Sequence, residues 1–283
     1  MAVTITIANE KGGVGKTTTA VNLAAGLALK LSGLEGPSGR VLLVDLDPQG
    51  HALLATGYGQ HNAPAASSLA TLLTEMPPPS VQPMLRPGTN HPNLFFIPSN
   101  RKAMTEAAAL LPTLMANESR LRRALSGVEK QFAYIIIDTP PTVGKLSLNA
   151  FFMSKYAIVP VETSYLGVSG LRELQNTIQE VRTLLGSDLE ILGYLPTLCD
   201  EQRSETQEIL SELQQRYPEQ MFAPIHRSTD LSYANSSHMD VFTYRPPRQR
   251  AQGQLASSSR ATQEYAALVE TVLDLTWPRS GQR

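Results

Sequence analysis

Residues 9–18, NEKGGVGKTT, place three glycines, two lysines and two threonines within ten positions. An alternating apolar stretch precedes this segment and a helical pattern follows it, so we expect it to form the turn between a strand and a helix. Backbone N–H groups of such a turn, together with a helix N-terminus, surround one concavity that favours bound phosphate. Lys16 is then expected to reach the β- and γ-phosphates of a nucleotide, and the Thr17 hydroxyl to bind Mg²⁺. The alternative is a glycine-rich turn that only packs a helix against a sheet.

The segment departs from the usual phosphate-loop pattern at one position. That pattern has glycine five residues before Gly15, and this chain has Glu10 there. A second lysine, Lys11, follows at once. The plain motif gives Lys11 no role, and an ordinary solvated lysine is the simplest alternative for it.

The elements that must position this loop follow from the rest of the chain. Short β-branched runs alternate with longer helical patterns, which predicts an α/β fold: a doubly wound, mainly parallel sheet with helices on both faces. The runs expected to be strands are almost wholly apolar, as in sheets covered on both faces. We expect strands at 3–8, 40–47, 93–99, 132–141, 156–162 and 190–198, and helices at 18–31, 67–73, 170–185, 203–217 and 261–275.

Length and composition favour a single domain over residues 1–283, since 42% hydrophobic residues can bury one large core. Segment 60–92 contains MPPPSVQP and many small polar residues, and we expect a Pro-rich surface excursion there. Because no run of about eighteen apolar residues occurs and no basic-then-apolar leader begins the chain, a soluble and unexported protein is expected, and the single cysteine favours the reducing cytoplasm. Cys199 is the one cysteine, which excludes an iron–sulfur cluster held within one chain. The net charge of −1 gives no global attraction to nucleic acid or to an anionic membrane.

Four segments resemble the ParA/MinD group of P-loop ATPases. KGGVGKTT (11–18) resembles the group's deviant Walker A motif, in which the first lysine is the signature. LLVDLDPQG (42–50) is similar to its second motif, and IIIDTPP (135–141) to its Walker B strand. GYLPTLCDEQRSETQEIL (193–210) resembles the segment that ends in the nucleotide-base contact. The similarity runs from residue 3 to about residue 244, and the ParA/Soj-type partition ATPases resemble the chain most, with McdA-like carboxysome-positioning members as a second branch.

The resemblance implies ATP and Mg²⁺ as cofactors and assigns roles to individual residues. It implies that Lys11 reaches across a two-fold interface to the phosphates of the other subunit, which makes the ATP state a homodimer. Asp47 matches the residue that orients the attacking water, so Lys11, Lys16 and Asp47 form the catalytic set. The residues implied in nucleotide binding are Gly12, Gly13, Val14, Gly15, Lys16, Thr17, Thr18, Pro196 and Thr197.

Mg²⁺ is expected near Thr17, Asp45 and Asp138. Asp138 follows an apolar run, where an unpaired carboxylate would be costly, so we expect it to serve the outer shell of the metal and to hold Thr17. Asp45 could support the metal through water, or could simply cap the end of its strand. His51 stands where the group often has asparagine, and Glu10 where glutamine is more usual; neither change removes a core catalytic group.

Segment 241–263 is the candidate DNA-contact segment, because it contains no acidic residue and four arginines. Arginines on such a stretch could contact phosphates without reading sequence, or could belong to a plain solvated loop. Residues 225–237 resemble the family segment that precedes this region, but the acid–alanine pair of the family is Tyr233–Ala234 here. The candidate DNA-binding residues are Arg227, Arg245, Arg248, Arg250 and Arg260.

The resemblance therefore implies a slow ATPase that dimerises with ATP, coats non-specific DNA in the nucleoid and positions a plasmid, a chromosome origin or a protein organelle. A ParB-like or adaptor protein would stimulate hydrolysis. Helix 261–275 carries three acids and no base, so membrane attachment is not expected. We also expect no helix-turn-helix domain ahead of the loop. The alternatives are a nucleotide-gated regulator that binds protein without DNA, and a biosynthetic ATPase that transfers phosphate to a carboxylate.

Overall fold

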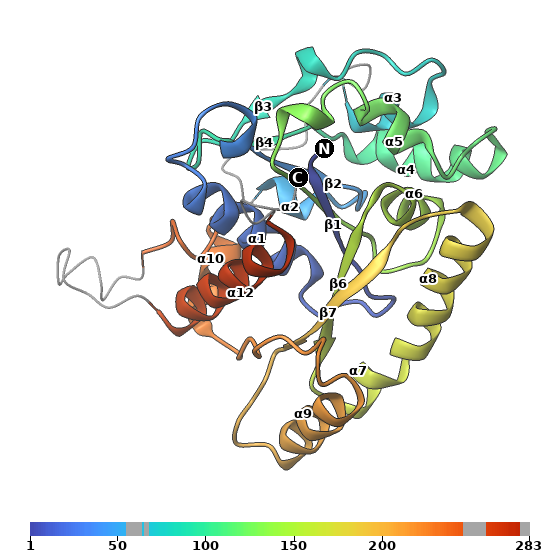
Figure 1. The fold of residues 1–283 in the computed structure, drawn as a ribbon. Coiled ribbons are helices and arrows are strands. Elements are labelled where there is room, and N and C mark those ends of the chain that lie inside the picture. Colours follow the sequence, from blue (N-terminus) through green and yellow to red (C-terminus); the bar gives the residue numbers. More distant parts are fainter. Residues whose placement is uncertain (55–63, 65–67, 246–258, 278–283) are drawn as a thin grey trace.

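The protein, seen in a computed structural model, is built around one seven-stranded sheet among the described residues (Figure 1). The structure describes residues 1–54, 64, 68–245 and 259–277. The strands are β1 (Val3–Ile7), β2 (Val41–Asp45), β3 (Arg86–Pro87), β4 (Leu94–Phe96), β5 (Tyr134–Asp138), β6 (Tyr156–Glu162) and β7 (Glu190–Thr197). The helices are α1 (Lys16–Lys30), α2 (His51–Leu54), α3 (Leu69–Thr74), α4 (Arg101–Leu110), α5 (Arg120–Leu125), α6 (Lys145–Met153), α7 (Tyr165–Ser169), α8 (Leu171–Leu185), α9 (Ser204–Arg216), α10 (Thr229–Ser236) and α12 (Arg260–Thr276), with 3₁₀ turns at Gly36–Gly39, Gln82–Met84, Leu111–Thr113 and Glu129–Gln131.

The strand order is β3-β4-β2-β5-β1-β6-β7, and every neighbouring pair is parallel except β3–β4. β1 lies between β5 and β6, so the strand order reverses direction around it. The carboxyl ends of parallel strands meet at one edge of a sheet, and ligands bind there at such a reversal. The loops after β1, β2, β5 and β7 therefore converge, and the predicted doubly wound, mainly parallel fold is confirmed.

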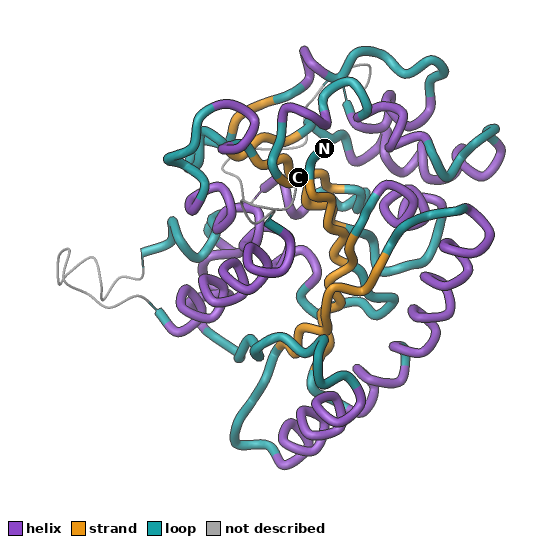
Figure 2. The backbone as a smooth tube through the Cα atoms, viewed as in Figure 1, coloured by secondary structure: helices purple, strands orange, loops and turns teal. Residues whose placement is uncertain are grey.

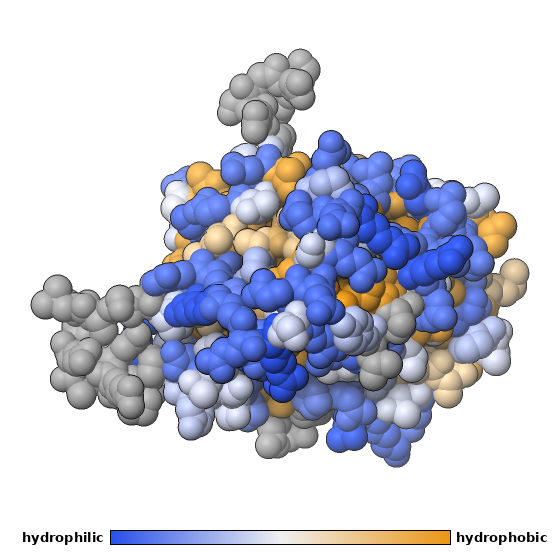
Figure 3. All heavy atoms as spheres, turned by 90° about the horizontal axis from the view of Figure 1, so that it is seen from below, coloured by the Kyte–Doolittle hydropathy of each residue, from blue (hydrophilic) through white to orange (hydrophobic). Residues whose placement is uncertain are grey.

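Helices cover both faces of the sheet, which forms the central layer between them (Figure 2). One apolar cluster joins the strands to α3, α4, α5, α6 and α8. The second joins the other face to α1, α10 and α12. Strands buried on both sides explain why the runs are apolar without alternation. Seen from below, the surface is mostly hydrophilic, with apolar atoms in smaller groups (Figure 3), and none of the described helices is long and apolar enough to cross a membrane.

The structure corrects the prediction for segment 60–92. Its helix forms at Leu69–Thr74, but Leu69, Leu72 and Leu73 are fully buried, so α3 belongs to the core and not to a surface excursion. The spacing of these leucines, i, i+3 and i+4, is that of a helix face turned toward a core. Residues 60–63 and 65–67 lie outside the described part of the chain.

Candidate nucleotide-binding site

The loop between β1 and α1 has the backbone shape that its glycines predict. Gly13 and Gly15 have φ values of 78° and 85°, in the left-handed region that favours glycine. Gly15 is also the N-cap of α1, and no side chain caps this helix. The first backbone N–H groups of α1 therefore face the loop, where they can bind an anion.

Lys16 is buried at the start of α1 and points back into the loop. Its ammonium donates a hydrogen bond to the backbone carbonyl of Lys11 at 2.7 Å. Burial lowers the pKa of Lys16, while the carboxylates of Asp138 and Asp47 raise it in part. The Lys16 ammonium thus lies between the loop and the carboxylates of Asp138 and Asp47, where it could bind a triphosphate.

Lys11 is held by several groups of its own chain. Its backbone N–H donates to Asn9 Oδ1 at 2.9 Å, and the Asn9 side chain donates to the carbonyl of Pro160 at 2.7 Å. The ammonium of Lys11 pairs with the Glu162 carboxylate at the end of β6. In this single chain, Lys11 therefore points to an intrachain partner, and its role across a dimer interface stays a prediction.

Asp138 ends β5 directly opposite Asp45 in the parallel register with β2. Both carboxylate oxygens of Asp138 are buried, and although the Thr17 hydroxyl and the Thr139 N–H lie near them, neither oxygen accepts a hydrogen bond of good geometry from the described residues. Burial raises the pKa of Asp138, Asp47 raises it further, and the nearby Thr17 hydroxyl and Lys16 ammonium lower it. A buried carboxylate without a partner is costly unless a ligand completes the site. This orphaned carboxylate beside Thr17 fits a hydrated Mg²⁺ bound mainly to a nucleotide.

Asp45 uses both carboxylate oxygens within its own segment. One accepts from the backbone N–H of Asp47 at 3.0 Å, and the other from that of Ala52 at 2.9 Å. Burial and the neighbouring Asp138 and Asp47 raise its pKa well above the ordinary value. The structure thus places Asp45 as the cap that joins β2 to α2, and its contact with a metal stays a prediction. Among the described residues, no group of three or more His, Cys, Asp or Glu side chains could hold a metal by itself.

Asp47 lies on the turn between β2 and α2. Its Oδ1 accepts from the backbone N–H of Gln49 at 2.9 Å, and its carbonyl accepts from Gly50 at 2.9 Å. A cavity of about 280 Å³ lies between this turn and the phosphate loop. The cavity is lined by Gly13, Gly15, Lys16, Thr17, Thr18, Asp47, His51, Thr139 and Pro141. The predicted catalytic carboxylate and the predicted phosphate ligands therefore share one cavity.

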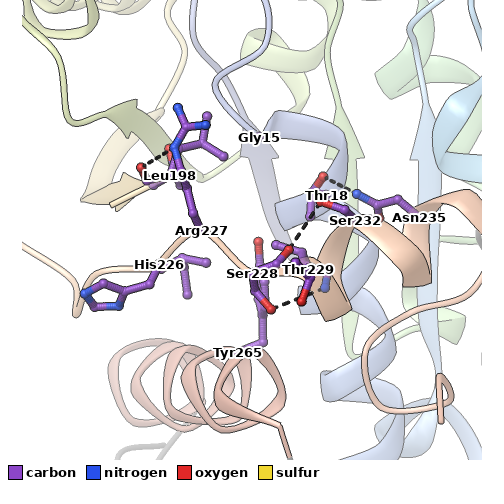
Figure 4. Close-up of a pocket in the computed structure, with 13 residues that line it drawn as sticks. Gly15, Thr18, Leu198, His226, Arg227, Ser228, Thr229, Ser232, Asn235 and Tyr265 are labelled. Carbon is purple, nitrogen blue, oxygen red and sulfur yellow. Dashed lines mark hydrogen bonds between the residues drawn. The ribbon is translucent and has the colours of Figure 1, made fainter. Parts of the chain in front are cut away.

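A second cavity, of about 340 Å³, adjoins the loop on the side of α12 (Figure 4). Its lining residues are Gly15, Thr18, Thr197, Leu198, Ile225, His226, Arg227, Ser228, Thr229, Leu231, Ser232, Asn235 and Tyr265. In Figure 4 the Asn235 side chain points to Thr18, to whose hydroxyl it donates at 3.2 Å, while the His226 ring points away from Thr18. Because this cavity continues from the phosphate loop, it is placed to hold the base and sugar of a nucleotide.

Of the two predicted base contacts, Thr197 lines this cavity and donates from its hydroxyl to the Val14 carbonyl at 2.9 Å. Pro196 lies on β7, where its carbonyl accepts from the N–H of Ile225 at 2.8 Å. The sequence reasoning missed Asn235 and Tyr265 as lining residues. The serine that caps α10, Ser228, marks the start of the helix that carries Asn235, but no signal placed Tyr265 of α12 here.

The predicted DNA-binding arginines have different environments. Arg227 lines the second cavity, of about 340 Å³, and its Nε donates to the Leu198 carbonyl at 3.3 Å. Arg245 is exposed and donates to the Phe242 carbonyl at 3.1 Å. Arg260 begins α12 and pairs with Glu201 and Glu264. Arg248 and Arg250 lie outside the described residues.

Segment 241–263 contains no acidic residue, but the fold brings acidic side chains from outside this segment next to Arg260. Glu201 comes from a loop distant in sequence, and Glu264 follows one helical turn after Arg260. These two carboxylates compensate the charge of Arg260, which weakens the case for Arg260 as a DNA contact.

A phosphate loop between β1 and α1, with carboxylates ending the two strands β2 and β5, defines a P-loop NTPase. The AAA_31 family model, described as an AAA domain, matches residues 2–191. The chain belongs to this AAA_31 family, among its ParA/Soj-type partition ATPases.

Two relatives cover most of the chain. The chromosome partitioning protein ParA of Myxococcus xanthus is 33% identical over 280 residues, which is 99% of this chain and 90% of the relative. The sporulation initiation inhibitor protein Soj of Bacillus subtilis is 36% identical over 243 residues, covering 86% of this chain and 91% of Soj.

Solved structures agree with this fold. Cobyrinic acid a,c-diamide synthase from Mycobacterium smegmatis, with bound ATP analog and magnesium, superposes with a TM-score of 0.70 at 31% identity, over 84% of this chain and 91% of that one. An ATP complex of a McdA variant from Cyanothece gives a TM-score of 0.77 at 22% identity, over 100% of this chain and 99% of that one, and shows the shared fold.

Proposed function

We propose that this protein is an ATP-dependent dimerising switch that binds DNA without sequence preference and positions or segregates a cargo. The observation that carries the nucleotide part is the buried Asp138 carboxylate beside Thr17, a residue that lines one cavity together with Lys16 and Asp47. Membership of the ParA/Soj-type family supports the partition role.

The geometry suggests how ATP would bind. The phosphates would lie on the N-terminus of α1, with Thr17 and the outer-shell Asp138 holding Mg²⁺, which supplies charge neutralisation of the triphosphate. The base would enter the 340 Å³ cavity beside Thr197. The Lys16 ammonium would donate to phosphate oxygens in place of the Lys11 carbonyl. Nucleotide binding would therefore break a hydrogen bond within the loop.

Hydrolysis would depend on Asp47 and Lys11. Asp47 sits on a turn that faces Lys16 and Thr17, where its carboxylate can orient a water for in-line attack on the γ-phosphate. Lys11 of a second loaded subunit would add a cation to the developing charge. Hydrolysis is then slow in the monomer, and a ParB-like or adaptor protein would stimulate it in the dimer.

DNA binding is proposed for segment 241–263, through Arg245, Arg248 and Arg250 in particular. Charged contacts of this kind bind phosphate without base readout and weaken with salt. The alternative is a nucleotide-gated regulator whose only partner is a protein. DNA retention that requires ATP and falls with salt favours the first function.

A biosynthetic role, as in the synthase from Mycobacterium smegmatis, is the second alternative. Phosphate transfer to a carboxylate needs a cation that holds the acceptor beside the γ-phosphate. Among the described residues that line the 280 Å³ cavity, Lys16 is the one lysine or arginine, and the triphosphate would bind it. The site therefore favours water as the acceptor.

The proposal is tested by sedimentation velocity without nucleotide, with ADP, and with a slowly hydrolysed ATP analogue plus Mg²⁺. A dimer in the analogue state alone supports the switch, and a monomer in all three states contradicts it. The DNA surface is tested on the dimer with Arg248→Gln and Arg250→Gln, each made singly. We expect each to lose more DNA affinity than the matched Arg260→Gln, because Glu201 and Glu264 already compensate Arg260.

A further inference from the structure

The Glu162 carboxylate at the end of β6 lies between two cations from different parts of the chain. It pairs with the Lys11 ammonium, and its Oε1 lies 3.9 Å from Nη2 of Arg227. We propose that Glu162 is a positioning residue that holds Lys11 within its own subunit. When Lys11 moves to the phosphates of a partner subunit, Arg227 pairs with the Glu162 carboxylate in its place. This inference rests on the proposed dimeric switch and names the residues that regulate it.

Nucleotide binding alone frees only part of Lys11. The Lys11 carbonyl is bound by the Lys16 ammonium at 2.7 Å, and a triphosphate would draw that ammonium away. Neither Lys11 nor Glu162 lines the 280 Å³ cavity, so a triphosphate bound there leaves their ion pair closed in a loaded monomer. A lysine that must reach another subunit cannot do so while this pair is closed.

The ion pair between Lys11 and Glu162 is partly exposed to water. The side chains of Lys11 and Glu162 are 32% and 25% exposed, so water screens their attraction. Ion pairs of this exposure are weak enough to open when a denser charge competes for one member. The phosphates of a second subunit provide that charge, whereas a lone monomer does not. The pair thus opposes release of Lys11 before a loaded partner arrives.

Glu162 need not remain unpaired after Lys11 leaves it. Arg227 is already within 4 Å, and its side chain is 56% exposed, so a small movement closes the contact. Arg227 also lines the cavity that is placed to hold the base and sugar. A nucleotide in that cavity would therefore touch the residue that replaces Lys11, which links loading of the site to release of the lysine.

The test measures the dimer dissociation constant by sedimentation in the presence of a slowly hydrolysed ATP analogue and Mg²⁺. Glu162→Gln removes the charge that holds Lys11, so we expect its dimer to be about twofold to fivefold tighter than wild type. Arg227→Gln should weaken the wild-type dimer, and should have no effect in the Glu162→Gln background. A merely structural loss at either residue would weaken dimers and would not produce this pattern.

The matched control is Glu270→Gln, which breaks another lysine–glutamate pair, with Lys30 at the opposite end of α1. It should leave the dissociation constant unchanged. ADP affinity of each monomeric variant shows whether the site is intact. If wild type dimerises and Glu162→Gln is equal or weaker, the proposed exchange is wrong while the switch stands. If neither wild type nor any variant dimerises, the switch and the exchange both fail.

Discussion

The Asp45 carboxylate accepts a hydrogen bond from the backbone N–H of Ala52 at 2.9 Å, and so joins the end of β2 to the first turn of α2. The same side chain also holds the N–H of Asp47 at 3.0 Å. The turn that carries Asp47 is therefore fixed to the carboxyl edge of the sheet by a residue two positions earlier. This arrangement keeps Asp47 at the cavity that it shares with Lys16 and Thr17.

Asp47→Ala should nearly abolish ATP hydrolysis, by at least about a hundredfold, because the variant lacks the carboxylate proposed to orient water. Its side chain holds only the N–H of Gln49 on an exposed turn, so nucleotide binding and dimerisation should persist. Single-turnover hydrolysis and sedimentation check the two expectations. Asp188→Ala is the matched control, since Asp188 is exposed and precedes β7 at the other edge of the sheet. Turnover at the wild-type rate would remove Asp47 from its role.

The sequence predicted those parts of the site that depend on neighbouring residues. Gly13 and Gly15 allow the left-handed backbone that this turn adopts, and the strand before and the helix after them fix the orientation of Lys16. The apolar run that ends at Asp138 likewise predicted a buried carboxylate at the sheet edge, which the structure confirms.

Contacts between distant segments could not be predicted in this way. Pairing of Lys11 with Glu162, and of Arg260 with Glu201, depends on how the loops after β6 and β7 turn at the sheet edge. The sequence also predicted strands too long at 93–99 and 132–141. β5 ends at Asp138 because Pro140 and Pro141, which follow after Thr139, have no N–H to continue the ladder.

Thr197→Val should destabilise the protein and weaken nucleotide binding. The Thr197 hydroxyl donates to the buried carbonyl of Val14 at 2.9 Å, and valine would fill the space without satisfying that carbonyl. We expect a loss of about 1–2 kcal/mol in the free energy of unfolding, measured with urea. Thr271→Val, at an exposed position on α12, should cost less. Equal effects of the two substitutions would show that the contact with Val14 is unimportant.

The stability of the nucleotide-free protein should fall as pH rises from about 4 toward neutrality. Burial raises the pKa values of Asp138 and Asp45 above those of the unfolded chain, so the folded state binds more protons in this range. Their contribution is fully present below the unfolded pKa and is lost as pH rises through the folded one. Urea unfolding at several pH values checks this, with Asp138→Asn as the comparison. Parallel profiles for wild type and variant would contradict the assignment.

Lys11→Ala should weaken dimerisation and hydrolysis more than nucleotide binding by the monomer. The substitution removes the cation proposed to reach the partner's phosphates, while the N–H groups of the loop remain. Lys30→Ala, at the far end of α1, is the control and should change none of the three. Sedimentation, turnover and nucleotide titration measure them separately. A uniform loss would mean that Lys11 acts within its own subunit.

The central claim, an ATP-dependent switch that binds non-specific DNA, is tested most directly with a random-sequence duplex. Binding of the purified protein is measured without nucleotide, with ADP, with ATP and with a slowly hydrolysed ATP analogue, each at two salt concentrations. We expect binding in the triphosphate states alone, and weaker binding at the higher salt, because arginine–phosphate contacts release counterions. Failure of every state to bind, while the ATP form still dimerises, would contradict the DNA-based account and assign the output to a protein surface.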